Sequence, residues 1–516
     1  MLNTPRSRRG MVTAPHHLAS EAGLRVLREG GNAIEAMIAI AANLAVVYPH
    51  MNSIGGDGFW LISVDGKPPV AIDACGAAAK AATVDLYKSK GLKTIPERGP
   101  LAANTVAGTL SGWAEAYALS REIGGKLPLA RLREGAVREL TESKLAGIKD
   151  APGFASHFLV DGKAPREGSV MKLAALGKTL RQIGERGPMD AYQGTLAKEI
   201  AADLARVGSP VTLEDLAAHK VQRREAISVP VKGARLFNFP PPTQGLASLM
   251  ILALFERLNV AECESFDYLH GIVESTKQAF LVRDAVVSDP AHMKERCEDY
   301  LTKEKLDELA KRIDRKRALP WPYVANPGDT VWAGAIDGNG VSVSFIQSVY
   351  FEFGSGCTLD NSAIVWQNRG SSFVLDGDGP RALRPGRKPF HTLNPAMALF
   401  DDGRRMVYGN MGGEGQPQTQ SAIFSRYAIY GQGLQQAITA PRWLLGKTWG
   451  DATVTLKLES RFDPALIQAM RDAGHDIEVL PDFTSTMGHG GAVVRHPDSV
   501  FEGATDPRSD GAAMGF

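Results

Sequence analysis

Residues 326–345 predict a β-hairpin whose first strand opens on a threonine. The apolar run 331–336 is typical of a buried strand, and 341–345 has the same character. The sequence Asp337-Gly338-Asn339-Gly340 between these runs is a strong turn signal. The pattern therefore places Thr330 at the start of a strand in the interior of a sheet.

A threonine in this position acquires a catalytic use if the chain is cut in front of it. Cleavage of the Asp329–Thr330 peptide bond, just after the turn signal Pro327-Gly328, would give Thr330 a free α-amine beside its hydroxyl. Nucleophile and base would then share one residue. A free α-amine has a pKa of about 7.7–8.0, which suits proton transfer near neutral pH. Taken alone, a threonine after Gly-Asp is more often structural, so the rest of the chain has to support this interpretation.

Composition limits the classes of protein that the chain can form. Of its 516 residues, 44% are hydrophobic and 22% are charged, which is typical of a globular protein with a large core. The net charge of +1 provides no basic field for nucleic acid or an anionic membrane. The longest apolar stretch, 33–48, is shorter than the roughly 20 residues of a membrane helix.

Targeting and cysteine patterns point to one compartment. The first 20 residues contain no apolar segment of the kind found in secretion signals. The four cysteines are widely separated and match neither zinc nor redox spacing, as expected for reduced thiols. We therefore expect a cytoplasmic protein with no metal, no nucleic-acid partner and no membrane partner.

The order of elements predicts stacked helical and sheet layers. Two helices precede a glycine-rich turn at 54–58, and two strands follow within 59–73. Residues 105–310 have mostly helical periodicity, whereas strand patterns dominate after Thr330, with one helical segment at 417–430. No repeat or linker separates the halves, so we expect one shared α+β core. The strand patterns after the hairpin fall at 363–367, 396–400, 405–409, 453–458 and 491–494.

Residues 408–415, Tyr-Gly-Asn-Met-Gly-Gly-Glu-Gly, form the glycine cluster most useful to a hydrolase. Glycines let backbone N–H groups approach a ligand, and an N–H that holds the oxyanion of a tetrahedral intermediate contributes roughly 2.7–4 kcal/mol. A tight turn would have the same composition. Neither this cluster nor 55–58 has the spacing of a phosphate-binding motif. His16-His17 and His489 lack metal spacing, and no Gly-x-Ser-x-Gly elbow is present, which leaves Thr330 as the best nucleophile.

Seven short motifs, most of them rich in glycine and small residues, are spread over almost the whole chain: Met11-Val12-Thr13-Ala14-Pro15-His16, Gly30-Gly31-Asn32-Ala33-Ile34-Glu35-Ala36, Gly55-Gly56-Asp57-Gly58-Phe59, Gly328-Asp329-Thr330, Phe353-Gly354-Ser355-Gly356, Gly412-Gly413 and Asp506-Pro507-Arg508-Ser509-Asp510-Gly511. In kind and in order they resemble the γ-glutamyltransferase family of N-terminal-nucleophile (Ntn) hydrolases. The resemblance implies a four-layer αββα sandwich.

The resemblance also implies how the chain matures and works. It implies self-cleavage before Thr330 into a large subunit, 1–329, and a small subunit, 330–516, which form a heterodimer that can pair into a dimer of heterodimers. The Thr330 hydroxyl would attack an amide carbonyl while its own α-amine moves the proton. The N–H groups of Gly412 and Gly413 would stabilise the oxyanion, and water or an amine would resolve the acyl-enzyme. No cofactor is required.

The residues that bind the glutamyl group in the family are replaced by other residues in this chain. An arginine that pairs with the substrate α-carboxylate is replaced by Cys75. The family's serine pair aligns with His391 and Thr392, and the two residues that hold the α-ammonium align with Arg369 and Ser372. Arg369 would repel an ammonium, so the expected preference shifts from a zwitterion to a plain anion. The alternative for Arg369 is a bridge between surface carboxylates.

Four segments look closer to the oxamate amidohydrolase branch of the family: Gly328-Asp329-Thr330-Val331-Trp332, Phe345-Ile346-Gln347-Ser348, Trp366-Gln367-Asn368-Arg369-Gly370-Ser371-Ser372-Phe373 and Pro389-Phe390-His391-Thr392-Leu393-Asn394-Pro395. Oxamate carries a carboxylate beside its amide and has no amine. A pocket with Arg369, His391 and Thr392 near the nucleophile suits such a molecule. The branch resemblance therefore implies hydrolysis of a small carboxylate-bearing amide, oxamate, to oxalate and ammonia.

The family resemblance also admits other functions. A γ-glutamyltransferase or glutathione hydrolase would turn over a γ-glutamyl anilide, and a cephalosporin-type acylase would accept larger amides. An uncleaved scaffold is disfavoured, because Thr330, Gly412 and Gly413 are all present. The residue that orients the Thr330 amine falls at either Ser344 or Ser348, where the resemblance fixes the alignment only to within about two residues.

Overall fold

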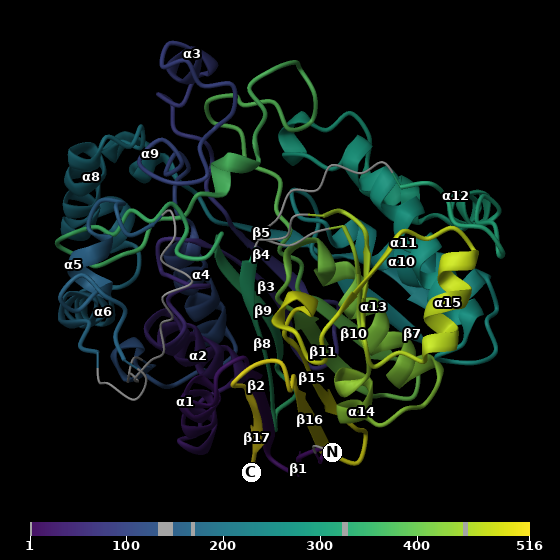
Figure 1. Cartoon of the computed structure of the whole chain (residues 1–516). Helices are drawn as coiled ribbons and strands as arrows, with labels where there is room; N and C mark the ends of the chain where they lie inside the picture. The colour runs from purple at the N-terminus through teal and green to yellow at the C-terminus, as the bar shows by residue number, and fades with distance from the viewer. Residues whose placement is uncertain (1–2, 133–147, 167–170, 322–328, 447–452) are drawn as a thin grey trace.

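Two seven-stranded antiparallel sheets face each other at the centre of the molecule (Figure 1). The structure is a computed structural model that describes residues 3–132, 148–166, 171–321, 329–446 and 453–516. Sheet I has the order β17 (Ala512–Gly515), β2 (Gly10–Ala14), β8 (Asp329–Asp337), β9 (Ser342–Tyr350), β3 (Asp57–Ser63), β4 (Val70–Ala74) and β5 (Gln222–Glu225). Sheet II has the order β1 (Arg6–Ser7), β16 (Phe501–Thr505), β15 (Gly490–Arg495), β11 (Arg405–Asn410), β10 (Ala396–Phe400), β7 (Ala234–Asn238) and β6 (Ile227–Val231).

Helices cover the outer face of each sheet, which completes four layers. Sheet I is covered by α1 (His17–Arg28), α2 (Ala33–Val47) and α4 (Thr109–Glu122). Sheet II is covered by α10 (Gly245–Arg257) and α13 (Gln416–Phe424), and α11 (Phe266–Val286) packs against α10. The expected αββα sandwich is therefore confirmed.

Smaller elements surround this sandwich. The remaining helices are α3 (Val84–Lys88), α5 (Phe154–Phe158), α6 (Ala174–Arg186), α7 (Asp190–Gln193), α8 (Thr195–Val207), α9 (Leu213–Ala218), α12 (Lys303–Ala310), α14 (Leu434–Thr439) and α15 (Pro464–Asp472). A third sheet contains β12 (Trp443–Leu445), β13 (Leu456–Glu459) and β14 (Ile477–Leu480). No helix in the described ranges is both long and apolar enough to cross a membrane.

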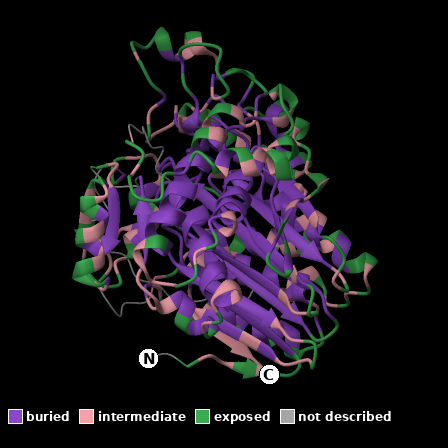
Figure 2. Ribbon diagram, turned by 90° about the vertical axis from the view of Figure 1, so that its right-hand side faces the viewer, coloured by how far each residue is buried: buried purple, intermediate pink, exposed green. Residues whose placement is uncertain are grey.

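The burial pattern explains why the central helices and strands are so apolar. Helix α2 is buried along almost its whole length, between sheet I and helices α1 and α4. It begins at a capping box in which Asn32 and Glu35 satisfy each other's backbone N–H groups. Figure 2 shows buried residues running through the sheets and inner helices, with exposed residues gathered on the outer elements. The layer between the sheets is also apolar, with Trp332 of sheet I and Val407 of sheet II among its members.

The predicted hairpin is confirmed as β8 and β9. Trp332 pairs with Ile346 and Gly334 with Ser344, and the register shifts between Asp329 and Val331. Strand β8 lies between β2 and β9, so it is an interior strand of sheet I. The predicted turn at Pro327-Gly328 lies outside the described residues.

Later strand predictions are mostly confirmed. Strands β10, β11 and β15 occupy the runs at 396–400, 405–409 and 491–494, and β13 begins within 453–458. The prediction of a strand at 363–367 is wrong, because this segment makes only isolated bridges. Its side chains are held by a loop instead, where Trp366 Nε1 donates to the Thr105 carbonyl at 3.1 Å.

Candidate active site

Thr330 lies at the beginning of β8 and is completely buried. The register pairs Ser348 of β9 with Asp57 of β3, and the register shift between Asp329 and Val331 leaves Thr330 opposite Ser348 and Val349. The Gln416 Nε2 amide donates a hydrogen bond to Thr330 Oγ1 at 3.3 Å. Since Gln416 begins α13 on the side of sheet II, the Thr330 hydroxyl faces the space where the two sheets meet.

The glycine cluster predicted to hold an oxyanion is close to this hydroxyl. Gly412 and Gly413 follow β11 and lead through the short 3-10 turn η6 (Gly413–Gly415) directly to Gln416. Their φ angles are +128° and +52°, in the left-handed region that glycine adopts without strain. Among the described residues, neither of their N–H groups donates a hydrogen bond. The structure therefore brings Thr330 together with two available backbone donors.

Gln244, which the sequence analysis did not identify as a site residue, holds the turn formed by Gly412 and Gly413, called the glycine turn below. Its Nε2 donates to the Gly413 carbonyl at 2.8 Å and to the Thr392 carbonyl at 2.7 Å. Its Oε1 accepts from Arg283 at 2.9 Å, and Arg283 pairs with Glu414 at 3.1 Å inside the protein. One amide thus connects the glycine turn to the segment that carries Thr392.

Arg369 is buried, with 2% of its surface exposed, in the 3-10 turn η5 (Arg369–Ser372). Its guanidinium lies 3.8 Å from the centre of the Tyr350 ring, and its Nε donates to the Phe390 carbonyl at 2.9 Å. Its Nη1 is buried and has no hydrogen-bond partner among the described residues. Burial lowers the Arg369 pKa to about 10, so the side chain stays positive at neutral pH. The alternative of a bridge between surface carboxylates is wrong, because the side chain is not at the surface.

His391 and Asp57 meet beside this arginine although they are far apart in sequence. His391 Nε2 lies 3.4 Å from Asp57 Oδ2, and both side chains are fully buried. Neither ring nitrogen of His391 nor Asp57 Oδ2 has a hydrogen-bond partner in the described structure. Asp57 Oδ1, in contrast, accepts from the N–H groups of Gly76 at 3.1 Å and Gly108 at 2.9 Å.

Burial determines the charge states of this pair. Desolvation raises the pKa of Asp57 to about 7, against the opposing effect of the backbone donors. Desolvation also lowers the pKa of His391 well below its ordinary value, and the positive charges of Arg369 and Lys388 act in the same direction. His391 is therefore neutral at physiological pH.

The other predicted substrate residues are arranged around this group. Ser372 Oγ donates to the Phe390 carbonyl at 3.5 Å, whereas Thr392 Oγ1 is buried without a partner in the described residues. Cys75 Sγ donates to Asp73 Oδ1 at 3.1 Å. Asp73 is in turn paired with Lys388 at 2.9 Å.

The structure distinguishes the two serines proposed to orient the Thr330 amine. Ser344 Oγ accepts from Trp332 Nε1 at 3.0 Å and lies farther along the hairpin. Ser348 lies on β9 at the register shift that faces Thr330. Its Oγ accepts from the Tyr350 N–H at 2.7 Å. Ser348 is thus the better candidate.

Three residues of the site were not singled out from the sequence. Asp57 was visible only as part of a glycine-rich motif, and Gln416 only as a position after the glycine cluster. Gln244 follows a run of prolines, which is a turn signal without chemical meaning. Because their partners come from distant segments, no local pattern could have assigned their contacts.

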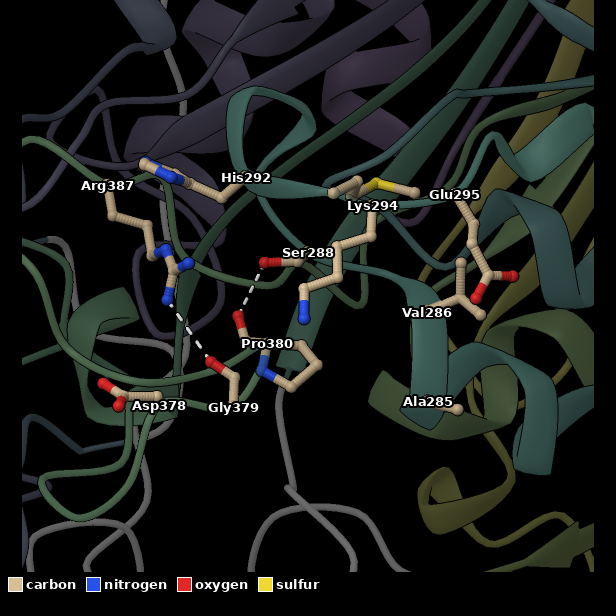
Figure 3. Close-up of a pocket in the computed structure, with 11 residues that line it drawn as sticks. Ala285, Val286, Ser288, His292, Lys294, Glu295, Asp378, Gly379, Pro380 and Arg387 are labelled. Carbon is tan, nitrogen blue, oxygen red and sulfur yellow. Dashed lines mark hydrogen bonds between the residues drawn. The ribbon is translucent and has the colours of Figure 1, made fainter.

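A cavity of ≈ 280 Å³ lies between the end of α11 with the residues that follow it and the loop that contains Gly379 and Pro380 (Figure 3). Ser288 and Arg387 line it, and Ser288 Oγ donates to the Pro380 carbonyl at 2.6 Å. Its lining includes neither Thr330 nor Arg369. The candidate site around Thr330 and Arg369 is therefore separate from this cavity.

An interior strand opening on a buried threonine, with backbone donors supplied from the facing sheet, defines an Ntn-hydrolase fold. The chain belongs to the γ-glutamyltranspeptidase family, whose family model matches residues 19–516.

Individual relatives match nearly the whole chain. The oxamate amidohydrolase proenzyme of Klebsiella pneumoniae subsp. pneumoniae is 52% identical, over 99% of each chain. The glutathione hydrolase-like YwrD proenzyme of Bacillus subtilis is 40% identical, over 98% of each chain. Among solved structures, the cephalosporin acylase of Bacillus halodurans has a TM-score of 0.90 at 32% identity, covering 100% of this chain and 97% of its own.

Proposed function

We propose that this chain is a precursor that cleaves itself between Asp329 and Thr330 and then hydrolyses oxamate to oxalate and ammonia. The products of cleavage would be a large subunit, 1–329, and a small subunit, 330–516, held together as a heterodimer. The substrate assignment rests on the buried Nη1 of Arg369, a cationic donor beside Asp57 and Tyr350 that has no hydrogen-bond partner within the described ranges. The relative named oxamate amidohydrolase proenzyme supports the same assignment.

In the proposed reaction the Thr330 oxygen attacks the amide carbon of oxamate. The Thr330 α-amine accepts the hydroxyl proton and returns it to the departing nitrogen, which leaves as ammonia. The N–H groups of Gly412 and Gly413 hold the oxyanion that forms in between. Water then attacks the resulting oxalyl ester, with the same amine as base, and releases oxalate and free Thr330.

Charge explains why a plain anion suits the pocket better than a glutamyl group. Arg369 offers a donor to a carboxylate, and a buried charge-assisted hydrogen bond is stronger than a neutral one. The position expected for the family's carboxylate-binding arginine holds Cys75, whose thiol is already directed to Asp73. A substrate ammonium placed beside Arg369 would be repelled, so a γ-glutamyl substrate would bind poorly.

The first experiment is the intact mass of the purified protein under denaturing conditions. Two chains that divide between Asp329 and Thr330 are expected, and Thr330→Ala should remain a single chain. If the Thr330→Ala variant splits as the parent does, cleavage is not autocatalytic and the proposed maturation is wrong.

The second experiment compares substrates on the processed enzyme. Ammonia release from oxamate should exceed turnover of a γ-glutamyl anilide by a wide margin. Preferential turnover of the anilide would instead support a glutathione hydrolase, the activity in the name of the relative that is 40% identical. Hydrolysis of larger acyl amides alone would support an acylase, the activity in the name of the matching solved structure.

The cellular setting is part of the proposal. All four cysteines are free, including the buried Cys75, Cys297 and Cys357, which supports a reducing compartment. We accordingly place the enzyme in the cytoplasm. Its partner there is a small-molecule amide.

A further inference from the structure

Asp57 has one oxygen that is fully satisfied and one that is not. Gly76 and Gly108 donate to Oδ1, which fixes the carboxyl group in place. Oδ2 is buried and lies 3.4 Å from His391 Nε2, and neither atom has a hydrogen-bond partner among the residues that the structure describes. Buried polar atoms without partners need an explanation, and a bound polar group that reaches several of them at once is one.

The charges of this cluster balance only while no anion is bound. Arg369 carries a positive charge, Asp57 carries a negative one when ionised, and His391 is neutral. An anion held by Arg369 would add a second negative charge to a buried space, where separated charges are costly. Neutralising Asp57 would remove that excess.

We propose that Asp57 determines the charge of the substrate by taking up one proton from solvent when a singly charged anion binds beside Arg369. This inference rests on the proposed function and extends it. The carboxylic acid form of Asp57 then offers an O–H donor where the carboxylate would repel the substrate. A second negative charge on the ligand would have no such compensation, so the pocket selects monoanions.

Several other titratable groups lie around Asp57. Burial raises the pKa of Cys75 and of Tyr192, and the pKa of Lys388 is raised because the nearby negative groups outweigh its desolvation. Asp73 is held by ion pairs to Lys388 and Arg224. After cleavage the free α-amine of Thr330, with an ordinary pKa of about 7.7–8.0, would also titrate between pH 6 and pH 9.

The test uses pyruvate, which has the shape and charge of oxamate but no amide to hydrolyse. Calorimetric titration of the processed enzyme should give a Kd that rises about tenfold per pH unit above pH 7, because the site must be protonated to bind. At pH 8, titrations in buffers of different ionisation enthalpy should show uptake of about one proton per pyruvate. No proton uptake by the unmodified enzyme would overturn the proposal without need of any variant.

The variant Asp57→Asn distinguishes proton uptake by Asp57 from proton uptake by the Thr330 amine. The amide keeps an oxygen for Gly76 and Gly108 but cannot ionise, so its Kd for pyruvate should be independent of pH and proton uptake should disappear. Proton uptake that persists in Asp57→Asn would assign the proton to the Thr330 amine and refute the proposal. Asp203→Asn, the same change at a buried position on α8, is the control and should behave like the parent.

Turnover measurements distinguish this inference from the proposed function. If oxamate is not hydrolysed but pyruvate binds with the expected proton uptake, the substrate assignment fails and the role of Asp57 stands. If oxamate is hydrolysed with a KM that does not change from pH 6 to pH 9, the role of Asp57 fails and the proposed function stands. Comparison of this KM profile with that of Asp57→Asn isolates Asp57, because the Thr330 amine titrates in both enzymes.

Discussion

A single buried guanidinium supplies the positive charge on which the proposed substrate preference depends. Arg369 packs on the Tyr350 ring and donates to the Phe390 carbonyl, and these contacts leave Nη1 for a ligand. Lysine could not reproduce this arrangement, since its point charge neither stacks on a ring nor offers a planar fork of donors.

Arg369→Ala should raise the KM for oxamate by roughly 10- to 150-fold, because a hydrogen bond to a charged group contributes about 1.5–3 kcal/mol. Self-cleavage should persist, and the measurement is steady-state kinetics combined with intact mass. Arg384→Ala is the control, because this exposed arginine pairs with Asp378 at the surface, away from the candidate site. An unchanged KM would remove Arg369 from the anion site.

Gly412→Ala tests the oxyanion donors. At φ +128° a side chain is strained, and a Cβ at Gly412 would lie 3.2 Å from the Cα of Gly488. Displacement of the N–H should lower kcat by about 10²–10³-fold with little change in KM. Gly431→Ala places an alanine at a φ of +70°, where no atom lies within 4 Å of the added Cβ. This control variant should retain kcat. An equal loss of kcat in both variants would attribute the effect to general strain.

At the scale of elements, the segment that connects β7 to α10 organises both halves of the site. The Gln244 N–H donates to the His391 carbonyl at 3.0 Å, while its side chain holds Thr392 and Gly413. The proline-rich turn before Gln244 thus fixes the glycine turn relative to the segment that carries His391 and Thr392. The segment at His391 pairs with Thr243 only through an isolated backbone bridge, and the Gln244 side chain adds the link from this segment to Gly413.

Gln244→Met keeps the length of the side chain and removes its donors. Two buried carbonyls lose a partner, which should lower the free energy of unfolding by about 1–3 kcal/mol each and kcat by about tenfold. Urea unfolding and kinetics measure the two effects. Gln435→Met is the matched control, because Gln435 is a buried glutamine that donates to the Thr505 carbonyl at 2.7 Å, in sheet II. A similar loss of kcat in the control would show that stability alone explains the effect.

At the scale of the whole molecule, both sheets combine strands from either side of the Asp329–Thr330 bond. Sheet I places β8 between β2 and β9, and sheet II places β10 between β7 and β11. Cleavage of one peptide bond leaves these ladders intact. The two proposed subunits should therefore stay together until the whole sandwich unfolds.

His489 makes the stability of this sandwich depend on pH. Burial lowers its pKa to about 4, so the folded protein binds fewer protons than the unfolded chain between pH 4 and pH 6.5. Stability should therefore fall as the pH falls through this window, by up to about 3 kcal/mol. His489→Gln removes this dependence, so the parent should lose stability relative to the variant from pH 6.5 to pH 4 in urea unfolding. Their difference should be constant from pH 7 to pH 8, and a constant difference down to pH 4 would contradict the prediction.

The sequence by itself determined the features that depend on neighbouring residues. The hairpin around Thr330 followed from alternating apolar runs and a turn signal, and the available donors at Gly412 and Gly413 followed from consecutive glycines. The layered fold followed from the order of motifs. Such features are encoded locally, because strand period and turn geometry depend on a few adjacent residues.

Only the tertiary structure decided which distant side chains meet and which of their atoms remain without partners. Asp57 and His391 are brought together from β3 and from the segment before β10, and Arg369 is buried against Tyr350 with one nitrogen unused. Gln244 acquires its role from carbonyls more than a hundred residues away. Burial and pairing depend on how the layers pack, and no local pattern in the chain encodes that packing.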